Sequence, residues 1–209
     1  MARNTKVKFT KTRNPIIVLI CEGRNKTESK FFNHFKTREN PYNLKIIPSE
    51  ATDPKNMAKK ARQAIDEMQL DNKLGDRVFC LVDLDLSPSQ LQKVEDEQKK
   101  TKKKCQVEFI LSNPCFEVWL LFYFVPHPKV EQSSQKVKEQ LKKYVPQYSE
   151  SFDIVKECKL EEKYAVAINR ADLKNMTYSS DNILDKNPYT EIPELLDILL
   201  SFNNNKKED

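Results

Sequence analysis

The chain has 209 residues, of which 38% are hydrophobic, enough for the core of one globular domain and too many for a disordered chain. Lysine and arginine number 36 against 31 aspartates and glutamates, and the formal net charge of +5 does not by itself indicate a nucleic-acid partner. No apolar run approaches the roughly 20 residues of a membrane span, and the N-terminal residues lack a signal-peptide core, so we expect a cytoplasmic protein without a membrane segment.

The cysteine and histidine content argues against two kinds of structural site. The five cysteines are odd in number and form no CxxC pair, which favours free thiols in a reducing compartment over a disulfide framework. Only two histidines, His34 and His127, are available to complete a zinc site, and neither has a partner at metal-ligand spacing. We therefore expect both histidines to be structural.

Short apolar runs alternate with helical patterns in the first 125 residues. Ile16–Cys21 and Val78–Val82 are continuous apolar runs that are too short for a stable helix, so each predicts a strand buried on both faces. Further strands are expected at residues 44–47 and 107–111, and helices from the Thr27 cap through Phe35, from residue 56 to 70, and from the Ser87 cap with Pro88 in its first turn.

Helical patterns dominate after Pro114. Strands that alternate with helices favour an α/β fold, with a mostly parallel sheet flanked by helices and a C-terminal helical extension. The predicted organisation is a basic flexible arm at residues 1–14, an α/β core at 15–125, a helical extension packed on the core at 126–202, and a polar tail at 203–209.

Carboxylates follow directly after two of the predicted strands. Glu22-Gly23 comes after the first run, and Asp83-Leu84-Asp85 comes after the run at 78–82. The carboxyl ends of parallel strands meet at one sheet edge, so we expect these side chains to converge, with both aspartates on one side of an extended segment. Clustered carboxylates repel one another unless a cation neutralises them. Glu22, Asp83 and Asp85 are therefore candidate ligands of Mg²⁺, with Mn²⁺ as an alternative.

A further carboxylate lies in the segment that follows the strand at 107–111. Asn113 or Ser112 can cap a helix with Pro114 at its first position, which places Glu117 in the first turn. Glu117 is then either a fourth catalytic carboxylate or a favourable partner of the helix dipole. Trp119 on the same helix is expected to be a core residue.

Basic residues near these carboxylates have two interpretations. Arg24, Lys26 and Thr27 lie just after Glu22, where they can bind a scissile phosphate or can be ordinary loop residues. The lysine-rich run Lys99–Lys104 can likewise track a phosphate backbone or form a solvated helix end.

Four motifs resemble the RloB family over roughly residues 15–200: CEGRNKTESKFF, LVDLD, SNPCFEVWLLFYF and NPYTEIPELLDILL. The resemblance implies a Toprim-like α/β fold, with Glu22 as acid/base and Asp83 and Asp85 as magnesium ligands. It also implies a role in bacterial defence, in AbiL-type abortive infection, often with a partner ATPase encoded nearby.

Three functions are compatible with these residues. We expect a magnesium-dependent nuclease, whose substrate is DNA or RNA. One alternative is a phosphotransferase of the haloacid-dehalogenase class, with the first Asp of Asp-x-Asp as covalent nucleophile, although that class places its nucleophile after the first strand, where this chain has Glu22. The other is a non-catalytic Toprim module that binds a nucleotide or a partner.

Overall fold

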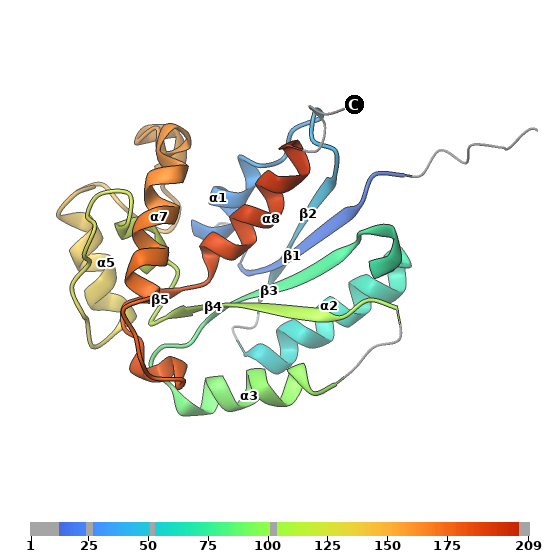
Figure 1. The fold of residues 1–209 in the computed structure, drawn as a ribbon, viewed down its shortest axis with the longest axis horizontal. Coiled ribbons are helices and arrows are strands. Elements are labelled where there is room, and N and C mark those ends of the chain that lie inside the picture. Colours follow the sequence, from blue (N-terminus) through green and yellow to red (C-terminus); the bar gives the residue numbers. More distant parts are fainter. Residues whose placement is uncertain (1–12, 24–26, 51–52, 101–103, 205–209) are drawn as a thin grey trace, which may run out of the picture.

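A computed structural model describes residues 13–23, 27–50, 53–100 and 104–204. It contains a five-stranded sheet in the order β2-β1-β3-β4-β5 (Figure 1). The strands are β1 (Ile16–Glu22), β2 (Asn43–Ser49), β3 (Arg77–Asp83), β4 (Val107–Asn113) and β5 (Tyr189–Thr190). The first four strands are parallel, and β5 is antiparallel to β4. The predicted α/β fold with a mostly parallel sheet is therefore confirmed.

Helices cover both faces of the sheet (Figure 1). One face packs against α2 (Pro54–Met68) and α3 (Pro88–Gln98). The other face packs against α1 (Thr27–Asn33), α4 (Glu117–Leu121) and α8 (Ile192–Asn204). The same apolar cluster continues into α5 (Ser134–Lys142), α6 (Ile154–Glu157) and α7 (Tyr164–Asn175), and short 3₁₀ turns occupy Asn72–Leu74, Leu160–Lys163 and Ile183–Asp185.

The position of β1 inside the sheet, with helices on both faces, explains why its sequence shows no polar alternation. Ile17 and Leu19 belong to the core on the α1 and α4 side, whereas Val18 and Ile20 belong to the core on the α2 and α3 side. All four side chains are fully buried, and each such burial contributes about 1.5–3 kcal/mol to folding. Because both faces are covered, every position in the strand is apolar until the chain reaches Glu22 at the sheet edge.

The two long helices on one face begin as helix-capping chemistry requires. The Asp53 carboxylate accepts the backbone N–H groups of Lys55 and Asn56, so α2 begins at Pro54, two residues before the predicted start. The Ser87 hydroxyl accepts the N–H of Gln90 at 3.4 Å, and α3 begins with a proline at its first position. The predicted Ser87 cap is confirmed.

The predicted helix start at Pro114 is wrong. The Asn113–Pro114 peptide is cis, and α4 begins only at Glu117. Asn113 does not cap this helix. Its side chain instead accepts the N–H of Leu86 at 3.3 Å and donates to the carbonyl of Lys186 at 2.9 Å. Asn113 therefore connects the end of β4 to the turn that precedes β5, which is a tertiary role that local sequence does not reveal.

Strand β5 lies inside the predicted helical extension and was not expected from the sequence. Its two residues pair with the end of β4, where Ser112 lies opposite Thr190 and their hydroxyls are 3.0 Å apart. The extension therefore adds a strand to the sheet as well as helices to its face. Helix α8 continues to residue 204, and residues 205–209 of the predicted polar tail lie outside the described residues.

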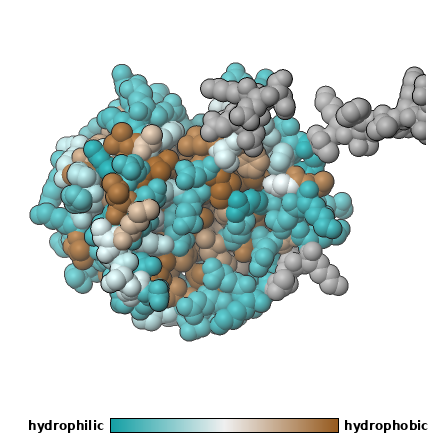
Figure 2. Space-filling model, viewed as in Figure 1, coloured by the Kyte–Doolittle hydropathy of each residue, from teal (hydrophilic) through white to brown (hydrophobic). Residues whose placement is uncertain are grey.

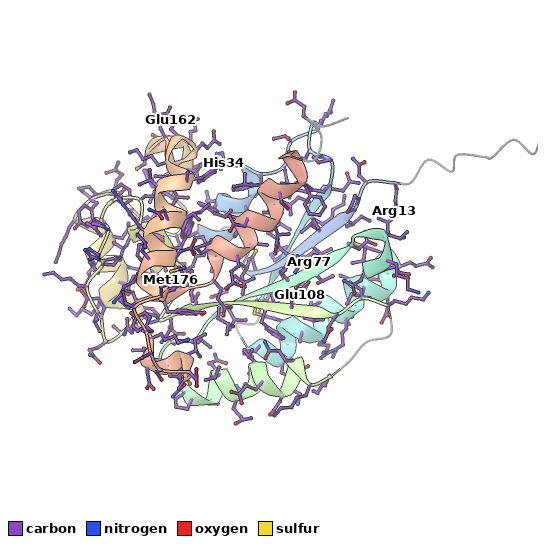
Figure 3. All side chains as sticks on the ribbon, viewed as in Figure 1. Arg13, His34, Arg77, Glu108, Glu162 and Met176 are labelled. Atoms are coloured by element: carbon purple, nitrogen blue, oxygen red, sulfur yellow. The ribbon has the colours of Figure 1, made fainter. Side chains whose placement is uncertain are left out.

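Aromatic side chains connect the core to the extension. Trp119 is fully buried with its ring centroid 6.2 Å from that of Phe31 on α1, which confirms its predicted core position. Tyr164 of α7 stacks on Phe35 at 5.2 Å. His34 lies between two carboxylates of the extension, with Nε2 2.9 Å from Asp153 and Nδ1 3.2 Å from Glu161 (its position is labelled in Figure 3).

The visible surface in Figure 2 is mostly polar, with apolar patches on the face where α7 and α8 lie. Exposed apolar side chains of this region include Leu173 and Met176, which is 80% exposed at the end of α7 (Figure 3). No helix in the described part of the chain combines the length and apolarity needed to cross a bilayer. In the lysine-rich run, Lys99 and Lys100 pair with Asp96 and Glu97 at the end of α3, and residues 101–103 lie outside the described residues.

Candidate metal and active site

The carboxylates at the ends of β1 and β3 meet at one edge of the sheet. Glu22 is the last residue of β1, Asp83 is the last residue of β3, and the two strands are parallel neighbours. Asp85 follows two residues later. All three side chains line one pocket of about 220 Å³. The structure thus brings together the three carboxylates that the sequence suggested as metal ligands, although about 60 residues separate Glu22 from the aspartates.

A fourth carboxylate, Glu28, belongs to the same cluster and was not predicted as a site residue. It lies in the first turn of α1, is only 8% exposed and also lines the pocket. One oxygen each of Glu22, Glu28 and Asp83 lies within 4.8 Å of the others. Glu28 lies in the first turn of its helix, where a negative charge also complements the helix dipole. The sequence feature that could have identified it is its position in the first turn of the helix after β1, because that turn lies at the same sheet edge as Glu22.

The Asp83 carboxylate has a strongly perturbed electrostatic environment. Its Oδ1 accepts the backbone N–H of Phe116 at 2.9 Å. Burial, followed by the nearby charges of Glu28 and Glu117 and then of the other carboxylates, raises the pKa of Asp83 well above its ordinary value. A cation bound among these oxygens would reverse that effect, because it would stabilise the charged form.

The Asp-x-Asp segment reaches the pocket in a different way from the one predicted. Asp85 and Leu86 have φ angles of +50° and +57°, so the segment turns instead of remaining extended. The backbone N–H of Asp85 donates to the Pro114 carbonyl at 2.9 Å, and the Ser134 hydroxyl of α5 donates to the Asp85 carboxylate. The expected strand alternation is therefore wrong, and Asp85 is held at the pocket by two other segments.

Glu117 lies behind Asp83 and does not line the pocket. It is in the first turn of α4 as predicted and is 4% exposed. The Tyr148 hydroxyl donates to Glu117 Oε1 at 2.7 Å, and its oxygen lies 2.8 Å from Oγ1 of Thr27. One ligand atom each of Asp83, Cys115 and Glu117 lies within 4.8 Å of the others. Both interpretations of Glu117 therefore remain compatible with its position.

The predicted substrate-binding residues beside Glu22 are placed only in part. Thr27 is the first residue of α1 and is buried, and its hydroxyl faces Tyr148 instead of lining the pocket. Thr27 is therefore the first residue of the helix and not the cap that precedes it. Arg24 and Lys26 lie outside the described residues.

The helical extension contributes two pocket residues that the sequence did not suggest. Ser134 and Lys138 of α5 both line the pocket with the carboxylates. The Lys138 ammonium lies 2.6 Å from Glu150 and 3.7 Å from Glu117. Burial alone would lower the pKa of Lys138, but the Glu117 and Glu150 carboxylates raise it above its ordinary value, so this side chain is charged.

The chemistry of the ligand atoms fits a hard divalent cation. The Glu22, Glu28 and Asp83 group offers only carboxylate oxygens, which Mg²⁺ and Mn²⁺ prefer. The neighbouring Cys115 offers a soft sulfur atom that does not suit such an ion, and burial above all raises the pKa of its thiol. The residues present therefore match Mg²⁺ better than a thiol-binding metal such as zinc.

Comparison with protein families supports the motif resemblance. No curated protein and no solved structure matches the chain. The family model described as RloB-like protein matches residues 17–199, a range that includes most of β1, the residues of the carboxylate pocket and most of α8. The chain therefore belongs to the RloB-like protein family.

Proposed function

We propose that this protein is a magnesium-dependent hydrolase of nucleic-acid phosphodiesters, with a Toprim-type site. The observation that supports this proposal is the all-oxygen group of Glu22, Glu28 and Asp83 within 4.8 Å, at the carboxyl edge of a parallel sheet. Asp85 adds a fourth carboxylate to the same pocket. Such a site has too much negative charge to bind a phosphate without a cation.

The roles of the residues follow from their exposure and position. Bound Mg²⁺ would polarise the phosphate and neutralise its charge. Glu28, which is buried, and Asp83, which is half-buried at the end of β3, would hold the ion, and Asp85 would complete the ligand set from the pocket side. Glu22, at the partly exposed tip of β1, would accept a proton from the attacking water. The water oxygen forms the new bond to phosphorus, and the bond to the leaving oxygen breaks as that oxygen gains a proton from solvent.

The cellular role is proposed on the basis of the family resemblance. We propose that the protein is an effector of anti-phage defence of the abortive-infection type and that it acts together with a partner ATPase. Expression in bacteria challenged with phage, with and without the partner, tests this role: protection that requires Asp83 supports it, and protection by an Asp83→Asn variant contradicts it.

The biochemical test uses purified protein, Mg²⁺ or Mn²⁺, and a panel of DNA and RNA substrates. We expect cleavage that EDTA and the Asp83→Asn substitution abolish. The matched control is Asp96→Asn, an exposed carboxylate on α3, which should cleave normally. A phosphorylated Asp83 trapped with a phosphomonoester would instead identify a phosphotransferase. Tight nucleotide binding without cleavage of any substrate would identify a non-catalytic module.

A further inference from the structure

We propose that α5 supplies a phosphate-binding subsite to the carboxylate pocket, in which Lys138 binds a non-bridging oxygen of the substrate phosphate. This inference rests on the proposed function, because it assumes a phosphodiester substrate. It concerns a residue of the helical extension, about 50 positions after the Asp-x-Asp segment, that no sequence motif suggested.

The geometry of α5 supports this subsite. Ser134 and Lys138 are four residues apart and therefore lie on one face of the helix, and that face lines the pocket. Ser134 donates a hydrogen bond to the Asp85 carboxylate, which fixes α5 against the Asp-x-Asp turn. Lys138 is thereby positioned one helical turn beyond that contact, beside the same pocket.

The charges that line the pocket explain why Lys138 would favour binding of a phosphate. Four carboxylates line the pocket, and Lys138 is the one lysine or arginine among its described lining residues. A phosphodiester is itself an anion, so it meets repulsion from every carboxylate that the metal does not neutralise. A fixed ammonium at the wall reduces that repulsion and binds phosphate as a point charge.

Lys138 retains hydrogen-bonding capacity for this role. An ammonium has three N–H donors. Glu150 accepts one at 2.6 Å, whereas Glu117 is 3.7 Å away, an ion-pair distance that is too long for a hydrogen bond. The side chain is 27% exposed, so the remaining donors can meet a ligand without breaking the contact with Glu150.

The experiment measures binding of a fluorescein-labelled single-stranded oligonucleotide in Ca²⁺, together with cleavage in Mg²⁺. Lys138→Met should weaken binding about 10- to 100-fold, as expected for loss of a charged hydrogen bond. It should also lower the slope of log affinity against log salt by about 0.7. Lys138→Arg should restore most of the slope. The matched control is Lys136→Met, a lysine of the same helix that is 59% exposed and pairs with Glu139.

A purely structural role gives a different result. If Lys138 serves only to hold Glu150 and Glu117, then Glu150→Gln should reproduce the effect of Lys138→Met, and the salt slope should not change. If the protein still binds and cleaves the oligonucleotide, that result overturns the proposed subsite but not the proposed hydrolase function. Binding that depends on Lys138 without cleavage supports the subsite and overturns the hydrolase. Absence of any oligonucleotide binding by the wild-type protein overturns both.

Discussion

The two ends of β3 carry aspartates with opposite electrostatic environments. Asp76, just before the strand, is fully buried, and both of its oxygens accept hydrogen bonds from the Arg13 guanidinium, at 2.8 and 2.5 Å. The backbone N–H groups of Ile16 and Asp71 also donate to it. Burial alone would raise the pKa of Asp76, but these partners lower it below its ordinary value. This carboxylate has its cation within the chain.

Asp83, at the other end of the strand, has no such cation among the described residues. Within the described residues its hydrogen-bond partner is one backbone N–H, that of Phe116, and its charged neighbours are other carboxylates. Aspartates at the two ends of β3 therefore differ: Asp76 has a cationic partner, and Asp83 has none among the described residues. This difference teaches that a carboxylate shielded from water indicates a metal site only when no side chain of the protein neutralises its charge. A bound cation must then supply the missing positive charge.

The largest expected effect concerns the uncompensated end. Glu22→Gln should lower the cleavage rate by about 10²- to 10⁴-fold, the contribution of a general base, and Asp83→Asn should abolish metal binding. Measured in EDTA, neither variant should be less stable than the wild type, because each removes a charge from a repulsive cluster. Calorimetry and circular dichroism provide the check. Unfolding of Asp83→Asn would show that the carboxylate is structural and would remove the contrast with Asp76.

The compensated end should respond in the opposite way. Asp76→Asn removes the charge of a buried carboxylate whose partner Arg13 is 40% exposed, and the weakened hydrogen bonds should cost about 1–3 kcal/mol in the free energy of unfolding. Cleavage per folded molecule should be unchanged, because Asp76 lies at the far end of β3 from the pocket. Urea denaturation compared with active-site titration measures the two separately. A loss of activity without loss of stability would contradict the assignment of Asp76 as purely structural.

Glu191 sharpens the comparison through its pH dependence. It accepts hydrogen bonds from the Leu111 N–H and the Tyr189 hydroxyl, yet burial raises its pKa to about 7. A raised pKa in the folded state means that protonated Glu191 contributes stability below its ordinary pKa, and that this contribution is lost as pH rises through 7. Between pH 4.5 and 7 the free energy of unfolding of the wild type should therefore fall by about 2–3 kcal/mol through this group, and Glu191→Gln should remove that change. If the free energies of unfolding of the variant and the wild type differ by the same amount at every pH in this range, the environment described for Glu191 is contradicted.

Local sequence predicted the parts of the fold and site that depend on short-range patterns. Continuous apolar runs ending in Glu22 and Asp83 placed both carboxylates at one edge, because parallel strands must align their ends. The Ser87 cap followed from side-chain chemistry in the same way. In contrast, the hydroxyl of Ser134 and the ammonium of Lys138 reach the pocket through packing of the extension, which no local pattern encodes.

Two further misses have physical causes. Strand β5 has only two residues and is stabilised by pairing with β4, so its sequence carries little strand signal. The turn at Asp85 depends on positive φ angles, which are uncommon for residues other than glycine, and an extended Asp-x-Asp was therefore the natural expectation.

The smallest effect tests the hydrogen-bonded group behind the pocket. Tyr148→Phe removes the hydroxyl that connects Glu117 to Thr27, and loss of this donor to a buried carboxylate should cost about 1–2 kcal/mol of stability. If Glu117 supports a second ion, Glu117→Gln should weaken metal binding and slow cleavage several-fold, while Tyr148→Phe should do so to a lesser degree. If Glu117 is only a helix-dipole partner, both variants should lose stability with no change in metal affinity. Titration with Mn²⁺ separates these outcomes, because Glu117 lies close enough to Asp83 for a shared ion but outside the pocket lining.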